Sequence, residues 1–578
     1  MESVQQLLER LATGVFRQSI GADGAANVRP CGNPKFGDYQ INGLLPIAKA
    51  RGENPRPLAE KVASALVSAL ADIAEPPTVA GAGFINVRLK PGFVGSLLPR
   101  VLADPRLGVP AASPARTIVI DYSAPNIAKQ LHVGHLRSTI IGDSIARTLE
   151  FLGHKVISDN HIGDWGTQFG FLLRSKSELG EYLGTSAIHL STIEQIYRKN
   201  VADAEKDPAA REEAKAELVK LQAGDPEATR IWKALCARTM EAITELYARL
   251  GVRPFDHTLG ESFYHPRLAG VVAELKKRGL AEDSEGAVCV FFRDVPQLKD
   301  KPFLIQKSDG ASLYATTDLA TVQYRVKTWK PGEIIYVTDS RQKLHFEQLF
   351  TTARRWDYAD LKLAHVTFGS VLGEDGKPIK TRSGDPIRLE ELLDEAEKRA
   401  QAIVDTNYAD LPEATRREIA RVVGIGAVKY ADLSQNRVND YVFSWPKMLA
   451  MQGNTAPYLQ YAYVRIRSIF RKGAETGQGV RGKGQEVVVL ADAAEFDLAK
   501  FILRFPEAIE LATEDYRPNF ICSYLYDLAG KFSVFYERCP VLKADEPARS
   551  SRLLLCQLTA EVLRKGLGLL GIQTIEQM

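Results

Sequence analysis

Cysteine is scarce in this 578-residue sequence, and no two cysteines stand at the Cys-x-x-Cys spacing of a metal site. The six positions are Cys31, Cys236, Cys289, Cys522, Cys539 and Cys556. Scattered cysteines argue against a disulfide framework and favour a reducing compartment. The missing Cys-x-x-Cys pair also argues against a zinc site built on thiolates.

Long apolar runs and a strong excess of one charge sign are also missing. No apolar stretch approaches the length that spans a bilayer. The N-terminal segment carries Glu2 and Glu9 and lacks the basic start and apolar core of a signal peptide. We therefore expect a cytoplasmic protein that makes no membrane contact. Because the formal net charge is only +3, any nucleic-acid-binding surface must be a local basic patch.

Two glycine-rich nucleotide motifs are absent as well. The sequence has no Gly-x-Gly-x-x-Gly and no Walker-type lysine, which disfavours a dinucleotide enzyme and a P-loop ATPase. The composition is otherwise ordinary, with 45% hydrophobic and 25% charged residues, typical of a soluble globular protein. A chain of this length should hold several domains.

The sequence pattern divides the chain into three parts. Residues 1–112 combine helical spacing with a strand-like segment and predict an α+β unit. Residues 113–390 alternate strand and helix patterns, which predicts a parallel sheet with helices on both faces; strands are expected at 117–121, 155–159, 287–292, 303–306, 333–338 and 364–368. A Glu-, Lys- and Ala-rich stretch at about 175–250 predicts a helical insertion. Residues 391–578 are almost wholly helical.

A histidine pair marks the junction of the first strand of the central part with the helix that follows it. The string His132-Val-Gly134-His135 stands where backbone N–H groups and the helix dipole attract an anion. Gly134 has no side chain, so a nucleotide can lie close to the backbone. The two imidazoles can donate hydrogen bonds to phosphate. One half of a zinc site, completed by His154 or His161, is the alternative, but no cysteine pair or suitably spaced carboxylate supports it.

The histidine motif resembles the signature of class I aminoacyl-tRNA synthetases. The four residues alone also occur in small nucleotidyltransferases, whereas the longer string SAPNIAKQLHVGHLRS (123–138) is similar to the arginine–tRNA ligase (arginyl-tRNA synthetase) branch, of bacterial type. The resemblance implies a multidomain α/β protein with a Rossmann-like catalytic domain at 113–390. It also implies an α+β tRNA-binding domain at 1–112, on the D-loop side of the tRNA, and an all-α anticodon-binding domain at 391–578.

A lysine-bearing, glycine-rich segment near the end of the central part suits the β- and γ-phosphates of ATP. It spans 373–384 and carries Lys377 and Lys380, although most Asp-Gly-Lys segments are solvated turns. Class I synthetases have a Lys-Met-Ser-Lys-Ser loop at this place. Here Lys380-Thr-Arg-Ser resembles it only loosely, and the second lysine is missing. In such arginine enzymes an upstream lysine supplies the missing charge, which the resemblance assigns to Lys129.

The implied reaction joins L-arginine and ATP to give arginyl-adenylate and pyrophosphate, followed by transfer to the terminal ribose of tRNA(Arg). No enzyme nucleophile is needed, so catalysis is positioning and electrostatic stabilisation, with Mg²⁺ on the nucleotide. By resemblance, His132, Gly134 and His135 contact ATP, and Lys129, Lys377 and Lys380 face pyrophosphate. The resemblance also implies a monomer. The sheet and the insertion nearly fill the interval from His135 to Lys380, so we expect no editing domain.

The substrate guanidinium is a planar, charged fork that carboxylates and amide oxygens bind best. Five positions match the arginine-pocket pattern of the family: Asp121, Asn126, Tyr314, Asp318 and Gln342. Each also has a plain alternative, as a surface Asp, a loop Asn, a packed Tyr, a helix N-cap for Asp318 and a surface Gln.

An aromatic and basic helix face in the C-terminal part predicts contact with RNA. Tyr458, Tyr461 and Arg465 fall at i, i+3 and i+7 and share one face of a helix. Aromatic plates beside a guanidinium suit splayed single-stranded bases, although such a stripe can equally be core. The resemblance favours anticodon binding and adds Tyr536 and Met578.

The sequence leaves two rival functions open. One is another class I synthetase, for cysteine, glutamine or glutamate; the lack of paired cysteines disfavours the first, and the acidic pocket disfavours the last. The other is a non-catalytic tRNA-binding paralogue, which the presence of both the histidine motif and the lysine segment disfavours.

Overall fold

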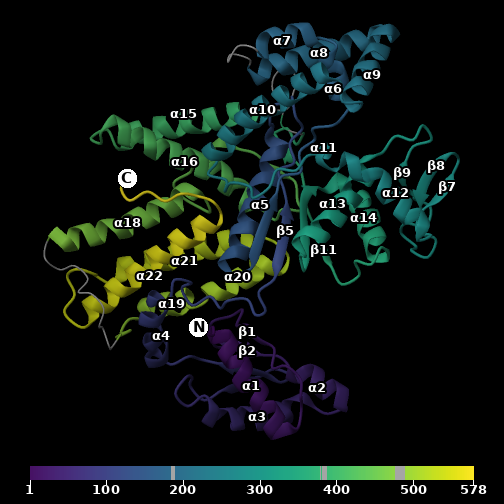
Figure 1. Ribbon diagram of the computed structural model, residues 1–578. Coiled ribbons are helices and arrows are strands. Elements are labelled where there is room, and N and C mark those ends of the chain that lie inside the picture. Colours follow the sequence, from purple (N-terminus) through teal and green to yellow (C-terminus); the bar gives the residue numbers. More distant parts are fainter. Residues whose placement is uncertain (184–188, 378, 380–386, 476–487) are drawn as a thin grey trace. The chain divides into compact units, whose positions relative to one another are not determined.

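The computed structural model describes residues 1–183, 189–377, 379, 387–475 and 488–578. The chain forms two compact units (Figure 1). Unit 1 comprises Met1–Ala111, Ala450–Gly568 and Thr574–Met578, and unit 2 comprises Ala112–Leu449 and Leu569–Gln573. The helices just beyond residue 390 thus lie in the unit that carries the parallel sheet. The division into three functional domains at 1–112, 113–390 and 391–578 stays a prediction.

Unit 2 is built on a four-stranded parallel sheet with the order β11-β10-β5-β6. The strands are β5 (Thr117–Asp121), β6 (Lys155–Asp159), β10 (Glu333–Asp339) and β11 (Lys362–Phe368). All four coincide with apolar runs read from the sequence, because strands buried on both faces are apolar at successive positions. Asp121 of β5 stands opposite Asp159 of β6 and Tyr336 of β10 in the register. This row of three side chains lies at the carboxyl ends of β5 and β6.

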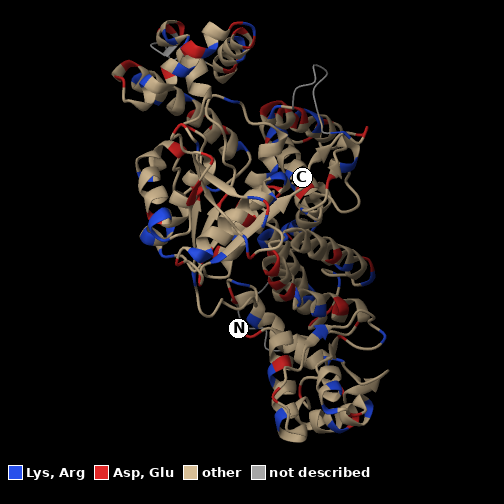
Figure 2. Cartoon of the chain, turned by 90° about the vertical axis from the view of Figure 1, so that its right-hand side faces the viewer, with Lys and Arg blue, Asp and Glu red and all other residues tan. Residues whose placement is uncertain are grey.

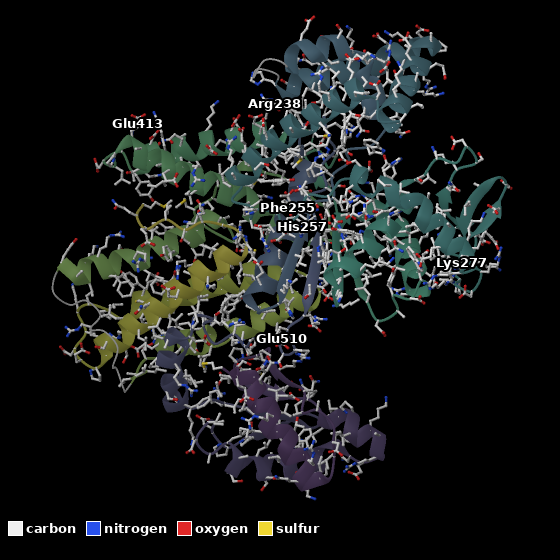
Figure 3. All side chains as sticks on the ribbon, viewed as in Figure 1. Arg238, Phe255, His257, Lys277, Glu413 and Glu510 are labelled. Carbon is white, nitrogen blue, oxygen red and sulfur yellow. The ribbon has the colours of Figure 1, made fainter. Side chains whose placement is uncertain are left out.

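Helix α5 (Val133–Phe151) connects β5 to β6 and is buried over most of its length. Its close approach to the chain after β5 depends on Gly142, because a Cβ at that position would lie 2.3 Å from the Tyr122 ring. Beyond the insertion, Phe255 and His257 lie near α5 and β6 (Figure 3). Phe255 packs on Tyr122 at 4.5 Å between ring centroids, and the His257 amide donates to Ser158 of β6.

Two of the predicted strands do not belong to the parallel sheet. The segments at 287–292 and 303–306 form β8 (Ala287–Val290) and β9 (Phe303–Gln306). In a separate antiparallel sheet, β8 pairs with β7 (Glu282–Ser284) on one side and with β9 on the other. For β8 the reason is the two-residue turn Glu285-Gly286, which joins it to β7 and in which both φ angles are positive. Such a turn matches the twist of an antiparallel hairpin, and a two-residue connection cannot carry a parallel crossover.

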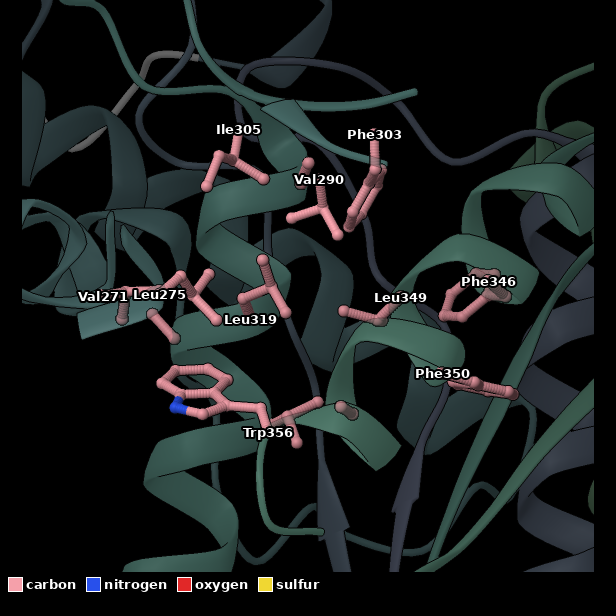
Figure 4. Close-up of a cluster of buried hydrophobic side chains, with 14 of the residues drawn as sticks. Val271, Leu275, Val290, Phe303, Ile305, Leu319, Phe346, Leu349, Phe350 and Trp356 are labelled. Atoms are coloured by element: carbon pink, nitrogen blue, oxygen red, sulfur yellow. The ribbon is translucent and has the colours of Figure 1, made fainter. Parts of the chain in front are cut away.

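A large core fills the space between this antiparallel sheet and the helices around β10 (Figure 4). The helices are α11 (Glu261–Tyr264), η1 (His265–Arg267), α12 (Leu268–Lys277), α13 (Tyr314–Trp329), η2 (Ser340–Gln342) and α14 (Lys343–Arg355). Leu319 of α13 and Leu349 of α14 are fully buried here. Trp356 is also buried, and its indole N–H donates to Glu274 at 3.0 Å. Truncating such an aromatic core residue typically costs about 3–5 kcal/mol.

The predicted helical insertion is present as a bundle with its own core. Its helices are α6 (Gln168–Leu173), α7 (Lys176–Leu183), α8 (Leu190–Lys206), α9 (Pro208–Gln222) and α10 (Pro226–Arg249). Helices α9 and α10 each begin with an aspartate N-cap, Asp207 and Asp225, followed by proline. This pairing satisfies an exposed N–H with a carboxylate and places proline where no N–H is needed.

Unit 2 ends in helices and a small two-stranded sheet. β12 (Val371–Leu372) pairs parallel with β13 (Tyr441–Val442), and the helices are α15 (Leu389–Asn407), α16 (Glu413–Leu433) and α17 (Trp445–Met448). Gly424 lets α16 pack closely on α15, because a Cβ there would lie 2.8 Å from the Ala396 carbonyl oxygen. The segment Leu569–Gln573 joins this unit through the buried Lys429, whose ammonium donates to Gly571 O at 2.6 Å.

The N-terminal part of unit 1 has an antiparallel sheet of order β1-β2-β4-β3 and four helices. The elements are α1 (Val4–Ile20), β1 (Val28–Pro30), β2 (Tyr39–Ile41), α2 (Leu44–Arg51), α3 (Pro55–Ala69), β3 (Thr78–Ala80), β4 (Phe84–Val87) and α4 (Pro91–Ala103). A capping box between Ser3 and Gln6 starts α1. This is the α+β architecture that the sequence predicts for residues 1–112.

The C-terminal part of unit 1 is helical. Its helices are α18 (Ala456–Glu475), α19 (Ala493–Ile502), α20 (Phe505–Glu514), α21 (Asn519–Arg538) and α22 (Ala548–Leu569). Two polar contacts join it to the N-terminal sheet within the same unit. Tyr39 Oη donates to Glu507 Oε1 at 2.5 Å, and Lys500 Nζ lies 2.8 Å from Asp38 Oδ1.

Acidic and basic residues are interspersed along the helices (Figure 2), in keeping with the formal net charge of +3. Among the described residues, no helix combines the length and the apolar character that crossing a membrane requires.

Candidate functional site

The histidine motif forms the N-terminus of α5, and its two imidazoles cap that helix. His132 is the N-cap residue, and its Nδ1 accepts a hydrogen bond from the Gly134 amide at 3.0 Å. His135 Nδ1 accepts one from the His132 amide at 3.2 Å. A ring whose Nδ1 accepts carries its proton on Nε2 when neutral. Each imidazole therefore keeps one Nε2–H donor for a ligand.

Both imidazoles are held in the neutral form at neutral pH. Burial, with the charges of His132 and Lys129, lowers the pKa of His135 to about 3. Burial also lowers the pKa of His132, and the nearby cations Arg341 and Lys129 add to this effect. The motif thus offers an anion two ring N–H donors, the helix dipole and a lysine charge. Gly134 is required here because a Cβ would lie 2.9 Å from the His132 ring.

The predicted cations are only partly placed by the structure. Lys129 is exposed, lies near the two histidines and has its Nζ 5.5 Å from the centre of the Tyr197 ring. Lys377 is exposed in a turn after β12, where its amide donates to Asp375. Lys380 lies outside the described residues.

A buried arginine that sequence reasoning missed connects α5 to the strands leading to Lys377. Arg137 is 1% exposed and donates to Gly369 O, just after β11, at 2.6 Å. Its Nε lies 3.0 Å from Asp432 of α16. At the other end of the lysine-bearing segment, the Val133 amide donates to Ile387 O at 3.1 Å. Both ends of that segment are therefore attached beside the histidine motif.

Four of the five predicted arginine-pocket residues lie at the carboxyl-end side of the sheet with solvent-accessible side chains. Tyr314 is 69% exposed, and Asn126 and Gln342 are also exposed. Asp318 is half-buried, and its Oδ2 lies 2.6 Å from His345 Nε2. Leu313, not Asp318, is the N-cap of α13. The alternative reading of Asp318 as a helix cap is therefore wrong.

Asp121, the fifth predicted residue, forms an ion pair with an arginine of the same chain. It is 5% exposed, and Arg325 Nη2 donates to its Oδ2 at 2.6 Å. The same nitrogen donates to Asp159 Oδ2 at 2.9 Å. The alternative of a surface aspartate is thus wrong, and the carboxylate is turned toward the interior.

Glu261 is a further acidic group at this place that sequence reasoning missed. Burial raises its pKa to about 7; the charge of His161 opposes this rise, and the carboxylates Asp164 and Asp318 reinforce it. Burial and the charge of Glu261 also raise the pKa of Tyr314. Glu261 therefore lies close enough to Tyr314 and Asp318 for their charges to interact. Its only sequence signal is an acidic residue after Gly260, in a stretch without helical or strand periodicity.

The predicted RNA-contacting side chains gather on α18 and α21 of unit 1. Tyr461 is 42% exposed, so it is not a core residue. The Arg465 guanidinium lies 4.5 Å from the centre of the Tyr536 ring. Near the C-terminus, Glu576 accepts hydrogen bonds from Tyr463 at 2.6 Å and from Arg467 at 2.7 Å, which holds the segment carrying the half-buried Met578 on α18.

A cavity of about 490 Å³ opens beside Tyr458 between α18, α19 and α21. Its walls combine the aromatic rings of Tyr458, Phe501 and Tyr526 with the charged groups of Asp527 and Lys531. Aromatic rings beside a cation can receive a nucleobase and its phosphate. Among the described residues, no cluster of three His, Cys, Asp or Glu side chains could hold a metal ion.

Three family models match the chain. Residues 97–445 match tRNA synthetases class I (R), catalytic domain. Residues 459–578 match the DALR anticodon binding domain, and residues 2–89 match the arginyl tRNA synthetase N terminal domain.

Similar proteins are found over the full length of the chain. It is 46% identical to the arginine–tRNA ligases of Hahella chejuensis, over 583 residues, and Nostoc punctiforme, over 592 residues, with 100% of both chains covered in each case. Among solved structures, arginyl-tRNA synthetase from Plasmodium falciparum matches with a TM-score of 0.84 and 30% identity, again over 100% of both chains. The Thermus thermophilus arginyl-tRNA synthetase matches with a TM-score of 0.81 and 26% identity, with the same coverage.

Proposed function

This chain belongs to the arginine–tRNA ligase family of class I aminoacyl-tRNA synthetases and attaches arginine to tRNA for protein synthesis; from that premise we propose which residues carry the reaction. Full-length identity of 46% to arginine–tRNA ligases and a catalytic model specific to the arginine enzymes exclude the rival amino acids. The non-catalytic paralogue is excluded on the same ground.

We propose that activation takes place at the N-terminus of α5. ATP with Mg²⁺ supplies the activated phosphate and the pyrophosphate leaving group. The Nε2–H groups of His132 and His135 donate to phosphate oxygens, and Gly134 lets the nucleotide lie against the backbone. Because both rings are neutral and already oriented by hydrogen bonds to amides, they stabilise developing charge without moving. Mg²⁺ would accompany the nucleotide, bound chiefly through phosphate oxygens and water.

The lysines Lys129, Lys377 and Lys380 are proposed to neutralise the leaving pyrophosphate. Support for Lys129 comes from its charge, which acts on both histidines. Support for the other two comes from the attachment of both ends of their segment beside the histidine motif.

The arginine side chain is proposed to bind Asp318, with Glu261 as a second carboxylate. Tyr314 would cover the guanidinium, and Asn126 and Gln342 would orient the α-amino and carboxylate end. Two carboxylates match the fork of a guanidinium, which a lysine ammonium cannot reproduce. A site with buried polar partners can reject such an analogue by roughly 10⁴-fold, because the unmatched groups stay unpaired.

Transfer RNA is proposed to reach unit 1 through its anticodon. Tyr458, Tyr461, Arg465, Tyr536 and Met578 form the proposed anticodon face, and the exposure of Tyr461 supports it. The N-terminal domain would contact the D-loop side. We further propose that the protein is a cytoplasmic monomer.

The main observation that supports the proposed site is the pair of imidazoles at the start of α5. Both are neutral and are oriented by hydrogen bonds to backbone amides. Pyrophosphate exchange with each of the twenty amino acids, with and without tRNA, tests it. Exchange should depend on arginine alone. Removing the carboxylate in Asp318→Asn should raise the KM for arginine far more than that for ATP, and equal effects would refute the pocket.

A further inference from the structure

A protein guanidinium occupies the interior beside the proposed arginine pocket. Arg325 of α13 is fully buried. Its Nη2 donates to Asp121 Oδ2 at 2.6 Å and to Asp159 Oδ2 at 2.9 Å, and its Nε reaches the same Asp159 oxygen at 3.2 Å. Its guanidinium carbon lies 5.4 Å from the centre of the Tyr336 ring.

The groups around Arg325 form one row across the sheet. Asp159, Asp121 and Tyr336 are register partners on the adjacent strands β6, β5 and β10, so their side chains stand on the same face. Adjacent strands are only about 4.8 Å apart. Two carboxylates at that spacing repel each other and cannot both stay ionised in the interior without a cation between them. Arg325 is that cation.

Arg325 also lies on the same stripe of α13 as the proposed substrate-binding side chains. At 100° per residue, Tyr314, Asp318 and Arg325 fall within about 40° of one another around the helix. Asp318 and Arg325 are separated by seven residues, or roughly 10 Å along the axis. Any rotation of α13 that released Arg325 would therefore turn Asp318 away from the pocket.

A second contact fixes the end of the same helix. Trp329, the last residue of α13, stacks on His257 at 4.7 Å between ring centroids, and His257 (labelled in Figure 3) is bridged to Asp159. The C-terminal half of the helix is thus held by Asp121 of β5, by Asp159 of β6 and by His257, which pairs with Asp159 through the backbone. Its N-terminal half, with Tyr314 and Asp318, faces the accessible space.

We propose that Arg325 is a positioning residue for arginine selection, which sets the rotation of α13 and occupies Asp121 and Asp159 so that the substrate guanidinium is directed to Asp318 and Glu261. This rests on the proposed function of Asp318 as a ligand of the substrate side chain. It assigns Asp121 to the internal guanidinium instead of the substrate. The internal arginine and the substrate arginine then each have their own pair of carboxylates on the same side of one helix.

The experiment compares Arg325→Lys with Asp318→Asn and with Arg354→Lys, a matched control on the exposed surface of α14. Lysine keeps the charge but places it on one nitrogen and lacks the planar fork of the guanidinium. In Arg325→Lys the KM for arginine should rise by roughly 10- to 100-fold, the scale of a small misplacement of a binding group. The KM for ATP and kcat at saturating arginine should change little. Arg354→Lys should behave like the parent protein.

A merely structural arginine gives a different result. It would lower the melting temperature and the active fraction while the KM for arginine of the folded protein stayed normal, and that outcome overturns the inference. So would equal increases in the KM for arginine and for ATP. If Arg325→Lys does not fold, Asp159→Asn replaces it, because it removes one of the two carboxylates and loosens the same helix.

The double variant separates failure of this inference from failure of the proposed pocket. If Arg325 acts through the position of Asp318, then Arg325→Lys added to Asp318→Asn should raise the KM for arginine no further; independent, multiplying effects refute the mechanism. If Asp318→Asn alone leaves the KM for arginine unchanged, the proposed pocket itself is wrong, and the inference is wrong with it. If Asp318→Asn raises it and Arg325→Lys does not, only the inference is overturned.

Discussion

Replacing Glu261 by glutamine should abolish a pH dependence of arginine binding that the structure predicts. The pKa of Glu261 is raised to about 7 by burial, with Asp164 and Asp318 adding to the rise and His161 opposing it. Between pH 6 and pH 8 its ionised fraction grows from about 0.1 to about 0.9. A cationic side chain binds the ionised form better. The KM for arginine in the parent protein should therefore fall across this interval, by up to about tenfold.

Glutamine keeps the shape of the side chain but cannot ionise. The Glu261→Gln protein should resemble the parent near pH 6, where the parent carboxyl is protonated, and should bind arginine about tenfold more weakly than the parent near pH 8. The KM for ATP should change little at any pH, because the charge of Glu261 is not among those that act on His132 or His135.

The raised pKa of Glu261 also predicts that the free energy of unfolding falls as the pH rises. The folded carboxyl keeps its proton up to about pH 7, whereas the unfolded one releases it near pH 4.5. The folded state therefore binds more protons between these values, and the contribution to stability, fully present below pH 4.5, is lost as the pH rises toward 7. The shift of about 2.5 units corresponds to about 3 kcal/mol. Glu261→Gln lacks this loss, so the stability difference between variant and parent should grow in favour of the variant between about pH 4.5 and pH 7 and stay constant above that.

Steady-state charging rates from pH 6 to pH 9 would give the two KM values, and denaturant unfolding from about pH 4 to pH 9 would give the stabilities. Glu241→Gln, on the exposed face of α10, serves as the control. The reasoning is refuted if the parent and Glu261→Gln show parallel pH profiles of the KM for arginine, because Glu261 would then not meet the substrate cation.

Three further predictions test the other parts of the site. Since the half-buried His135 supplies a pre-oriented donor, His135→Ala should slow pyrophosphate exchange by roughly 10²–10³-fold, and near-normal exchange by the folded variant would disprove that role. Lys129→Ala should slow exchange without weakening tRNA binding in a filter assay; unchanged exchange would show that Lys129 is an ordinary surface charge. Tyr461→Ala should weaken cognate tRNA binding by about 1–3 kcal/mol with little change in melting temperature, whereas Tyr463→Ala, in the core, should destabilise the protein by about 3–5 kcal/mol. Normal tRNA binding by Tyr461→Ala would remove it from the anticodon face.

The parallel sheet and the helical parts could be predicted from the sequence because each follows from a local pattern. Strands buried on both faces leave continuous apolar runs, and the insertion shows helical spacing between aspartate caps. The membership of 287–290 and 303–306 in a separate sheet could not be read from those runs. For 287–290 it depends on the positive φ angles at Glu285 and Gly286, and only the second of these residues signals such a turn by its type.

The residues of the candidate site also differ in whether a local sequence pattern could predict them. The histidine motif was found because all of its parts are adjacent in sequence and its chemistry is that of a helix terminus. Glu261 and Arg325 were missed because their roles come from partners far away in the sequence: Arg325 lies 204 positions from Asp121. A pairing of that kind has no spacing rule, so the sequence could not show that Asp121 is ion-paired with Arg325; the predicted role of Asp121 in substrate binding stays a prediction.

The contact between Tyr39 and Glu507 has a consequence for how the chain is made. These residues are 468 positions apart, and the unit that they share combines the first 111 residues with residues from Ala450 onward. Synthesis at roughly 5–20 residues per second separates those two segments by tens of seconds. The core of the parallel sheet, which lies between them in sequence, can close during that interval. The first segment made must therefore wait on the ribosome with part of its interior uncovered, and it is this segment that a nascent-chain chaperone should meet.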